Sequence, residues 1–139
     1  MVVNAFRRLE ARPELVLDVV RLYLGVGLFV RGLALLGVDA GVLKLAGGPL
    51  PGVPLTGIAI YVMAAHLVGG ALMIVGLYTR LAALIQVPVL IGAVFLVHWQ
   101  EGLLSANQSL EFSALVLYLL LVVCVFGGGS WSLDARWRT

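Results

Sequence analysis

Four long apolar runs constrain this chain more than any other feature. They cover residues 15–37, 57–77, 81–98 and 110–126. A helix needs about 20 mostly apolar residues to cross the hydrocarbon core of a bilayer, and each run is close to that length. Only 12% of the residues are charged, whereas a soluble domain carries roughly 25%. We therefore predict an all-α integral membrane protein, a four-transmembrane-helix bundle that forms a single domain over residues 1–139.

Basic residues are distributed unevenly between the two sides of this predicted bundle. With four spans, the 78–80 turn lies on the same side as both termini. That side carries six arginines: Arg7, Arg8, Arg12, Arg80, Arg136 and Arg138. The opposite side carries only Lys44. Because Lys and Arg accumulate in cytoplasmic loops, both termini are predicted to be cytoplasmic. The net charge of +2 is thereby explained by topology, and no nucleic-acid partner is expected.

Small residues predict where the helices touch. Gly25 and Gly32 are seven residues apart in the first run, and Ala65 and Gly69 form a small-xxx-small pair in the second. Such residues let backbones approach closely in a membrane, where no hydrophobic effect drives helix association. The loop over residues 38–56 is rich in Gly and Pro but also apolar, so it is expected to fold back onto the bundle.

Ionisable residues inside the runs are the candidate site residues, because such groups are rare in membranes and usually face the bundle interior or a cavity. Asp18 and Arg21 are i and i+3 on the first helix and are predicted to form a structural ion pair. This structural pair is expected to extend its side chains to the cytoplasmic headgroups.

A second set of polar residues comes to the half of the bundle away from the termini. It consists of Arg31, His66, His98 and Glu111, one from each helix. Together they predict a ligand-binding site, although each residue also has a purely structural explanation. Glu111 is the only acid in the spans on that half, so Arg31 is predicted to point inward and pair with it.

The sequence offers no recognisable catalytic chemistry. The single cysteine, Cys124, cannot form a dithiol pair, and no motif for zinc, nucleotide phosphate or an activated serine is present. The catalytic residues are unknown, no metal site is expected, and no cofactor is predicted, although a quinone is kept as a candidate ligand.

Several segments resemble the DoxX family of small bacterial membrane proteins, which is related to the DoxD subunit of thiosulfate:quinone oxidoreductase. They are residues 21–29 with Gly32, residues 69–83 with the Gly-x-x-Thr-Arg turn, His98, Glu111, and the Gly-Gly-Gly-Ser-Trp-Ser-Leu-Asp stretch at 127–134. The resemblance implies a four-helix protein of the bacterial cytoplasmic membrane that is associated with redox enzymes and with sulfur or quinone chemistry.

Three functions remain open at this stage. The first is a membrane subunit of a redox or respiratory complex, without catalytic activity of its own, that contributes to a quinone or lipid headgroup site. The second is a quinone-linked oxidoreductase subunit that uses the Arg31, His66, His98 and Glu111 cluster. The third is a small oligomeric transporter or channel. The expected partners are the lipid bilayer and either other membrane or redox subunits or further copies of the chain.

Overall fold

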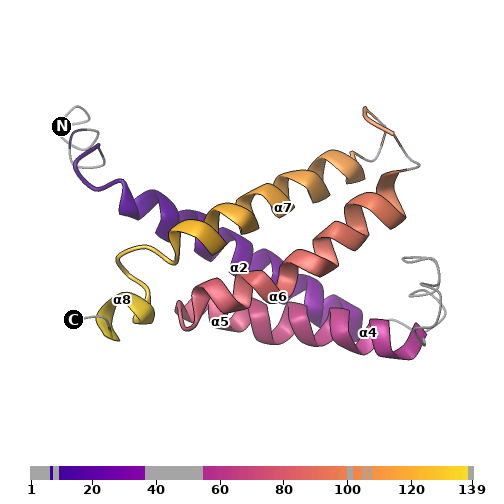
Figure 1. Cartoon of the computed structure of the whole chain (residues 1–139), viewed down its shortest axis with the longest axis horizontal. Helices are drawn as coiled ribbons and strands as arrows, with labels where there is room; N and C mark the ends of the chain where they lie inside the picture. The colour runs from indigo at the N-terminus through magenta and orange to yellow at the C-terminus, as the bar shows by residue number, and fades with distance from the viewer. Residues whose placement is uncertain are drawn as a thin grey trace.

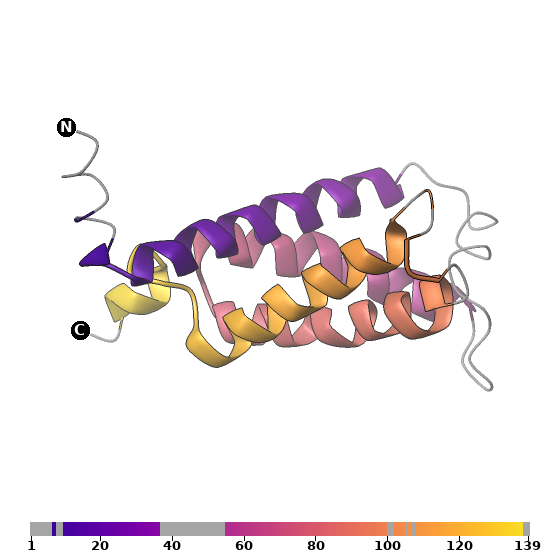
Figure 2. The ribbon, with the colours of Figure 1, turned by 90° about the horizontal axis from the view of Figure 1, so that it is seen from above.

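A computed structural model describes residues 7, 10–36, 55–99, 102–104, 106 and 108–137. These residues are entirely helical or irregular, with no strand among them. The chain forms four apolar helical spans, each antiparallel to the one before it (Figures 1 and 2). All four are long enough to cross a membrane. The predicted all-α class with four spans is therefore confirmed. The predicted 38–56 loop lies almost wholly outside the described residues, and the structure does not test it.

The first two spans have these bounds. Helix α2 covers Glu14–Leu36, and the second span runs without a break through α4 (Leu55–Ala64), the π-helical stretch η1 (Ala65–Gly69) and α5 (Gly70–Val75). The sequence predicted that the second helix would reach residue 77. It ends at Val75 because Gly76 adopts a left-handed conformation with φ 77°, which closes a helix at little cost only for glycine.

The other two spans start slightly earlier than predicted. The third consists of α6 (Thr79–Gly92) and the π-helical stretch η2 (Ala93–His98), and the fourth is α7 (Ser109–Phe126). A short helix, α8 (Leu133–Trp137), follows the irregular segment 127–132. The beginnings of α2 and α6 and the ends of α5 and α7 lie together, which we call the terminal end; the opposite end is the loop end (Figure 1).

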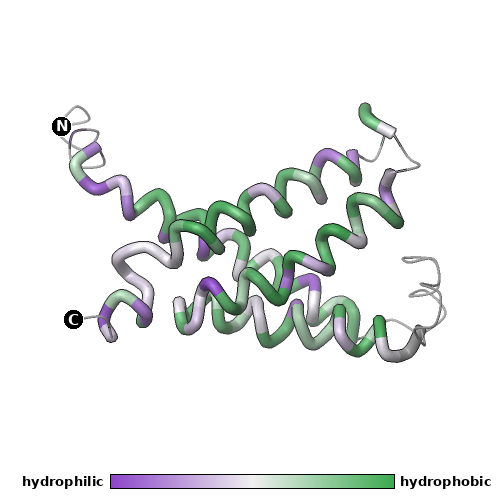
Figure 3. The backbone as a smooth tube through the Cα atoms, in the orientation of Figure 1, coloured by the Kyte–Doolittle hydropathy of each residue, from purple (hydrophilic) through white to green (hydrophobic). Residues whose placement is uncertain are grey.

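Each span turns a narrow face inward. On α2 the buried face contains Asp18, Arg21, Gly25, Leu28 and Gly32, spaced alternately by three and four residues as in left-handed helix packing. At most a third of each span is buried within the bundle. The remaining apolar surface, green along the helices in Figure 3, is therefore available to lipid.

Small residues form the closest helix contacts, as predicted. A Cβ atom at Gly25 would lie 2.8 Å from the backbone nitrogen of Ile74, and one at Gly32 would lie 2.9 Å from that of Leu67. A Cβ atom at Gly69 would lie 2.8 Å from the Gln86 side chain on α6. The prediction that Gly69 lies at a helix–helix contact is thus confirmed.

Candidate functional site

The terminal end contains a fully buried pair of opposite charges. The side chains of Asp18 and Arg21 are 1% and 2% exposed, and Arg21 Nη2 lies 3.5 Å from Asp18 Oδ1. The ion pair expected from the i,i+3 spacing is therefore present. Both side chains are buried, so the expectation that this pair extends to the headgroups is wrong.

Arg21 makes its shorter contacts with backbone carbonyls. Nη1 donates to Met73 O at 2.5 Å and to Ile74 O at 2.7 Å, and Nε donates to Gly128 O at 2.8 Å. The first two carbonyls belong to the last turn of α5, where no further helical N–H can reach them. A guanidinium suits this position because it satisfies these acceptors and also opposes the negative end of the helix dipole. Arg21 thus joins α2, α5 and the segment after α7.

Asp18 holds the same segment from the other side. Its carboxylate accepts hydrogen bonds from Ser130 Oγ at 3.2 Å and from the Trp131 backbone N–H at 3.1 Å. The carboxylate also excludes any side chain at Gly129, where φ is 83° and a Cβ atom would lie 2.5 Å from the carboxyl group of Asp18. This close packing explains why a glycine is needed at that position.

Asp134 closes the arrangement at the start of α6. Its two carboxylate oxygens accept the backbone N–H groups of Tyr78 and Thr79, each at 2.7 Å, and its own N–H donates to Gly76 O at 3.0 Å. A carboxylate at this position caps the unsatisfied first N–H groups of a helix and favours the dipole. We call Asp18, Arg21 and residues 128–134 the terminal clamp.

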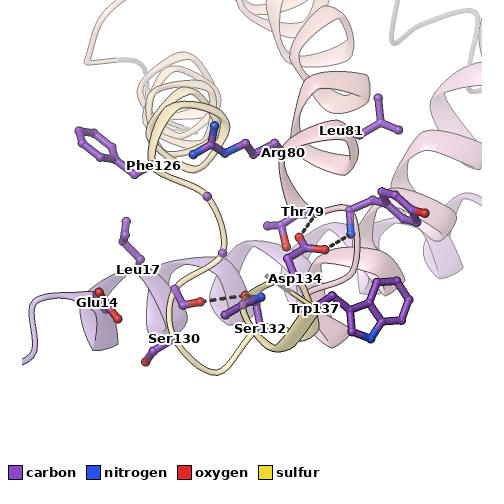
Figure 4. Close-up of a pocket in the computed structure, with 15 residues that line it drawn as sticks. Glu14, Leu17, Thr79, Arg80, Leu81, Phe126, Ser130, Ser132, Asp134 and Trp137 are labelled. Carbon is purple, nitrogen blue, oxygen red and sulfur yellow. Dashed lines mark hydrogen bonds between the residues drawn. The ribbon is translucent and has the colours of Figure 1, made fainter. Parts of the chain in front are cut away.

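An open pocket of about 570 Å³ lies beside the terminal clamp (Figure 4). Its walls include the ends of three spans: Glu14 begins α2, Thr79 begins α6 and Phe126 ends α7. Arg80 lines the pocket and runs along Gly127, where a Cβ atom would lie 3.3 Å from Arg80 Nε. Thr79 Oγ1 is buried and has no hydrogen-bond partner among the residues that the structure describes.

The polar set predicted at the loop end is not assembled as expected. Arg31 is exposed, so the prediction that it points into the bundle is wrong. Among the described residues no ion pair joins Arg31 to Glu111, so their predicted pairing is not found. Both residues lie beside the buried faces of their helices, next to Gly32 and Leu110 respectively.

Glu111 instead serves the loop that precedes α7. Its Oε1 accepts the backbone N–H of Leu104, a residue with a positive φ of 64°. The other oxygen, Oε2, is buried without a partner among the described atoms. His98 is half-buried at the end of η2.

His66 is the member of this set that faces the interior. Its side chain is 3% exposed, and Nδ1 lies 2.7 Å from Val62 O. Because a carbonyl only accepts, Nδ1 carries the proton, and Nε2 of the neutral ring is then an acceptor. Gly32 packs on Leu67, which places Arg31 and His66 at the same level of the bundle.

Gln86 is an interior polar residue that the predicted sites did not include. It is fully buried on α6; Nε2 donates to Ala65 O at 2.5 Å, and Oε1 has no partner in the described part of the chain. Asp134 and Arg80 were likewise absent from the predicted sites. The signal for Gln86 was its position on the same helix face as Ala82, Ala83 and Leu90, which are also buried.

The described residues contain no group of three or more His, Cys, Asp or Glu side chains placed to hold a metal ion. A family model described as DoxX matches residues 16–99, which is more than half of the chain. The match includes the Asp18–Arg21 pair and the α5–α6 turn but ends before the 128–134 part of the clamp. No curated protein and no solved structure matches the chain.

Proposed function

Because the chain belongs to the DoxX family of membrane proteins, we propose that it is a non-catalytic membrane subunit of a redox or respiratory complex. In this proposal it lies in the bacterial inner membrane with both termini in the cytoplasm, and it binds its partner through the lipid-facing side of α2 near the loop end. The observation that carries the proposal is the exposure of Arg31 within a membrane span.

Arg31 is informative because a residue that is exposed on a membrane span faces lipid rather than water. Exposed leucines and valines on a span meet lipid, whereas an arginine is unfavourable there, by about 2.5–3.5 kcal/mol on translocon scales when it lies at the centre of the helix. Arg31 lies five residues before the end of α2, roughly 7.5 Å along the helix at 1.5 Å per residue. It has no acidic partner among the described residues. A carboxylate on a neighbouring subunit would supply a matching two-pronged acceptor.

A quinone is the second candidate for this surface, because a quinone carbonyl could accept a hydrogen bond from Arg31. His66 lies at the same level, but its side chain is only 3% exposed, so a quinol hydroxyl would have to enter between the helices to donate to His66 Nε2. This reading supports the quinone-linked alternative, in which the chain contributes part of the quinone site. It gives no role to His98 or Glu111, which therefore remain candidates only from their sequence positions.

The test is purification from native membranes in lipid nanodiscs of the wild type, Arg31→Leu and Arg31→Lys. Arg12→Leu is the matched control, because Arg12 is exposed and precedes the spans. We expect a cofactor-containing membrane protein to co-purify with the wild type, the control and the lysine variant, and to be lost with Arg31→Leu. Equal recovery of that partner with all four chains would refute the proposal.

Two further measurements on the same samples separate the alternatives. Solvent extraction would reveal a quinone that is bound by the wild type and lost with Arg31→Leu, which would favour the quinone site over a protein interface. Native mass measurement would reveal a closed oligomer of this chain alone, which would favour the transporter or channel reading and exclude the proposed subunit role.

A further inference from the structure

We propose that the pocket at the terminal end binds the headgroup of an amine-bearing zwitterionic phospholipid, of the phosphatidylethanolamine type. The pocket is separate from the α2 surface around Arg31, and the proposal does not depend on the function proposed above. It rests on three features of the pocket: its level in the membrane, its two opposite charges, and the mixture of polar and apolar groups in its walls.

The level of the pocket follows from the helices that form it. Glu14 is the first residue of α2, Thr79 the first of α6, and Phe126 the last of α7. The pocket therefore lies where three spans leave the hydrocarbon core, which is the level of lipid headgroups. Trp137 also lines it and is 70% exposed, in keeping with the enrichment of Trp at membrane interfaces. At about 570 Å³ it falls within the usual range of small-molecule sites, roughly 300–1,000 Å³.

The charges of the pocket favour a zwitterion over a simple anion. Arg80 and Glu14 come from different elements, on either side of the 127–130 segment (Figure 4). Both side chains are exposed, and in the described part of the chain no ion pair involves either of them. The third charge, Asp134, already accepts two backbone N–H groups at the start of α6. An anion alone would meet two carboxylates and one guanidinium, whereas a zwitterion can match both free charges.

In the proposed complex the headgroup has one orientation. Its phosphate pairs with the exposed Arg80 guanidinium, which forms strong hydrogen bonds with phosphate oxygens. The ammonium donates to the Glu14 carboxylate. The apolar side chains of Leu17, Leu81 and Phe126 then contact the part of the acyl chains nearest the headgroup.

The experiment is native mass spectrometry of the full chain in detergent, after delipidation and addition of equal amounts of three lipids with identical acyl chains. The lipids are phosphatidylethanolamine, phosphatidylcholine and phosphatidylglycerol. The wild type should retain phosphatidylethanolamine best, because phosphatidylcholine has no N–H to donate and phosphatidylglycerol has no cation. Arg80→Gln should weaken retention about fivefold, the effect of one basic residue at a lipid surface.

A second variant tests whether Glu14 binds the ammonium group of the lipid. Glu14→Gln should abolish the preference for phosphatidylethanolamine over phosphatidylglycerol while retaining binding of both. Arg12→Gln is the control, since Arg12 is exposed and does not line the pocket. Equal retention of the three lipids by the wild type would overturn the proposal, and so would unchanged retention by Arg80→Gln. Equally tight binding of soluble phosphoethanolamine would show that the lipid is not the source of the headgroup.

Discussion

Replacing Arg21 by methionine should destabilise the bundle strongly, because it leaves Asp18 as a buried and uncompensated charge. The Asp18 side chain is 1% exposed, so water cannot replace the guanidinium without opening the packing. Breaking one partner from a buried ion pair costs about 3–5 kcal/mol. Three carbonyls also lose their donor, those of Met73, Ile74 and Gly128. We therefore expect the loss of unfolding free energy to lie at the upper end of that range.

Two companion variants separate the charge from its geometry. Arg21→Lys keeps the charge, but one nitrogen cannot serve the acceptors that Nε, Nη1 and Nη2 serve, so it should lose about 1.5–3 kcal/mol, the value of a hydrogen bond to a charged group. Combining Arg21→Met with Asp18→Asn removes the uncompensated charge. The double variant should lose less than the sum of the two single losses, by about 0.5–3 kcal/mol.

The measurements are reversible unfolding in mixed micelles and hydrogen exchange of residues 128–134. The Trp131 amide, which donates to Asp18, should lose protection in Arg21→Met. Arg12→Met is the control and should stay within about 0.5 kcal/mol of the wild type, as exposed substitutions usually do. A loss below 1.4 kcal/mol, the value of a tenfold change in the equilibrium constant, or strict additivity in the double variant, would refute the account of Arg21 as the centre of the clamp.

Three further predictions concern other parts of the chain. Gly129→Ala should cost at least about 1–3 kcal/mol for the left-handed conformation, measured by the same unfolding assay, whereas Gly27→Ala, with nothing within 4 Å of its Cβ position, should not destabilise. Arg31→Met and Glu111→Gln should be additive in a double-mutant cycle, because no ion pair joins them; coupling above about 0.5 kcal/mol would contradict this. Reporter fusions at the C-terminus and in the 38–56 loop should report opposite compartments, with the C-terminus cytoplasmic; any other result would overturn the topology.

The spans could be predicted from the sequence because they depend on local properties. Length and hydropathy are enough to identify a membrane helix, and the small residues already indicated the close contacts at Gly25, Gly32 and Gly69. The ends of the helices were less accurate, since the left-handed conformation of Gly76 depends on what packs against it. A Cβ atom there would lie 2.7 Å from Ser132, a residue 56 positions later in the sequence.

The inward orientation of Arg31 and its pairing with Glu111 were predicted wrongly, because depth in the membrane was considered without the angle around each helix. Arg31 precedes the buried Gly32 by one position, and Glu111 follows the buried Leu110 by one. One residue corresponds to about 100° of rotation, since an α-helix has 3.6 residues per turn. The polar residues that are buried, such as Arg21 and Gln86, share their helix face with other buried residues. Their partners at 128–134 lie too far along the sequence for any local pattern to indicate.

The terminal clamp also sets the order in which the protein can be completed during synthesis. Arg21 meets Gly128, 107 residues later, and Asp18 meets Trp131, 113 residues later. Until the 128–134 segment emerges from the ribosome, Asp18 and Arg21 can pair with each other, but both lack the hydrogen-bond partners that this segment supplies. The terminal end therefore closes last, after all four spans have been translated. A nascent chain halted before Gly128 should expose this unfinished end to the proteases that remove incomplete membrane proteins.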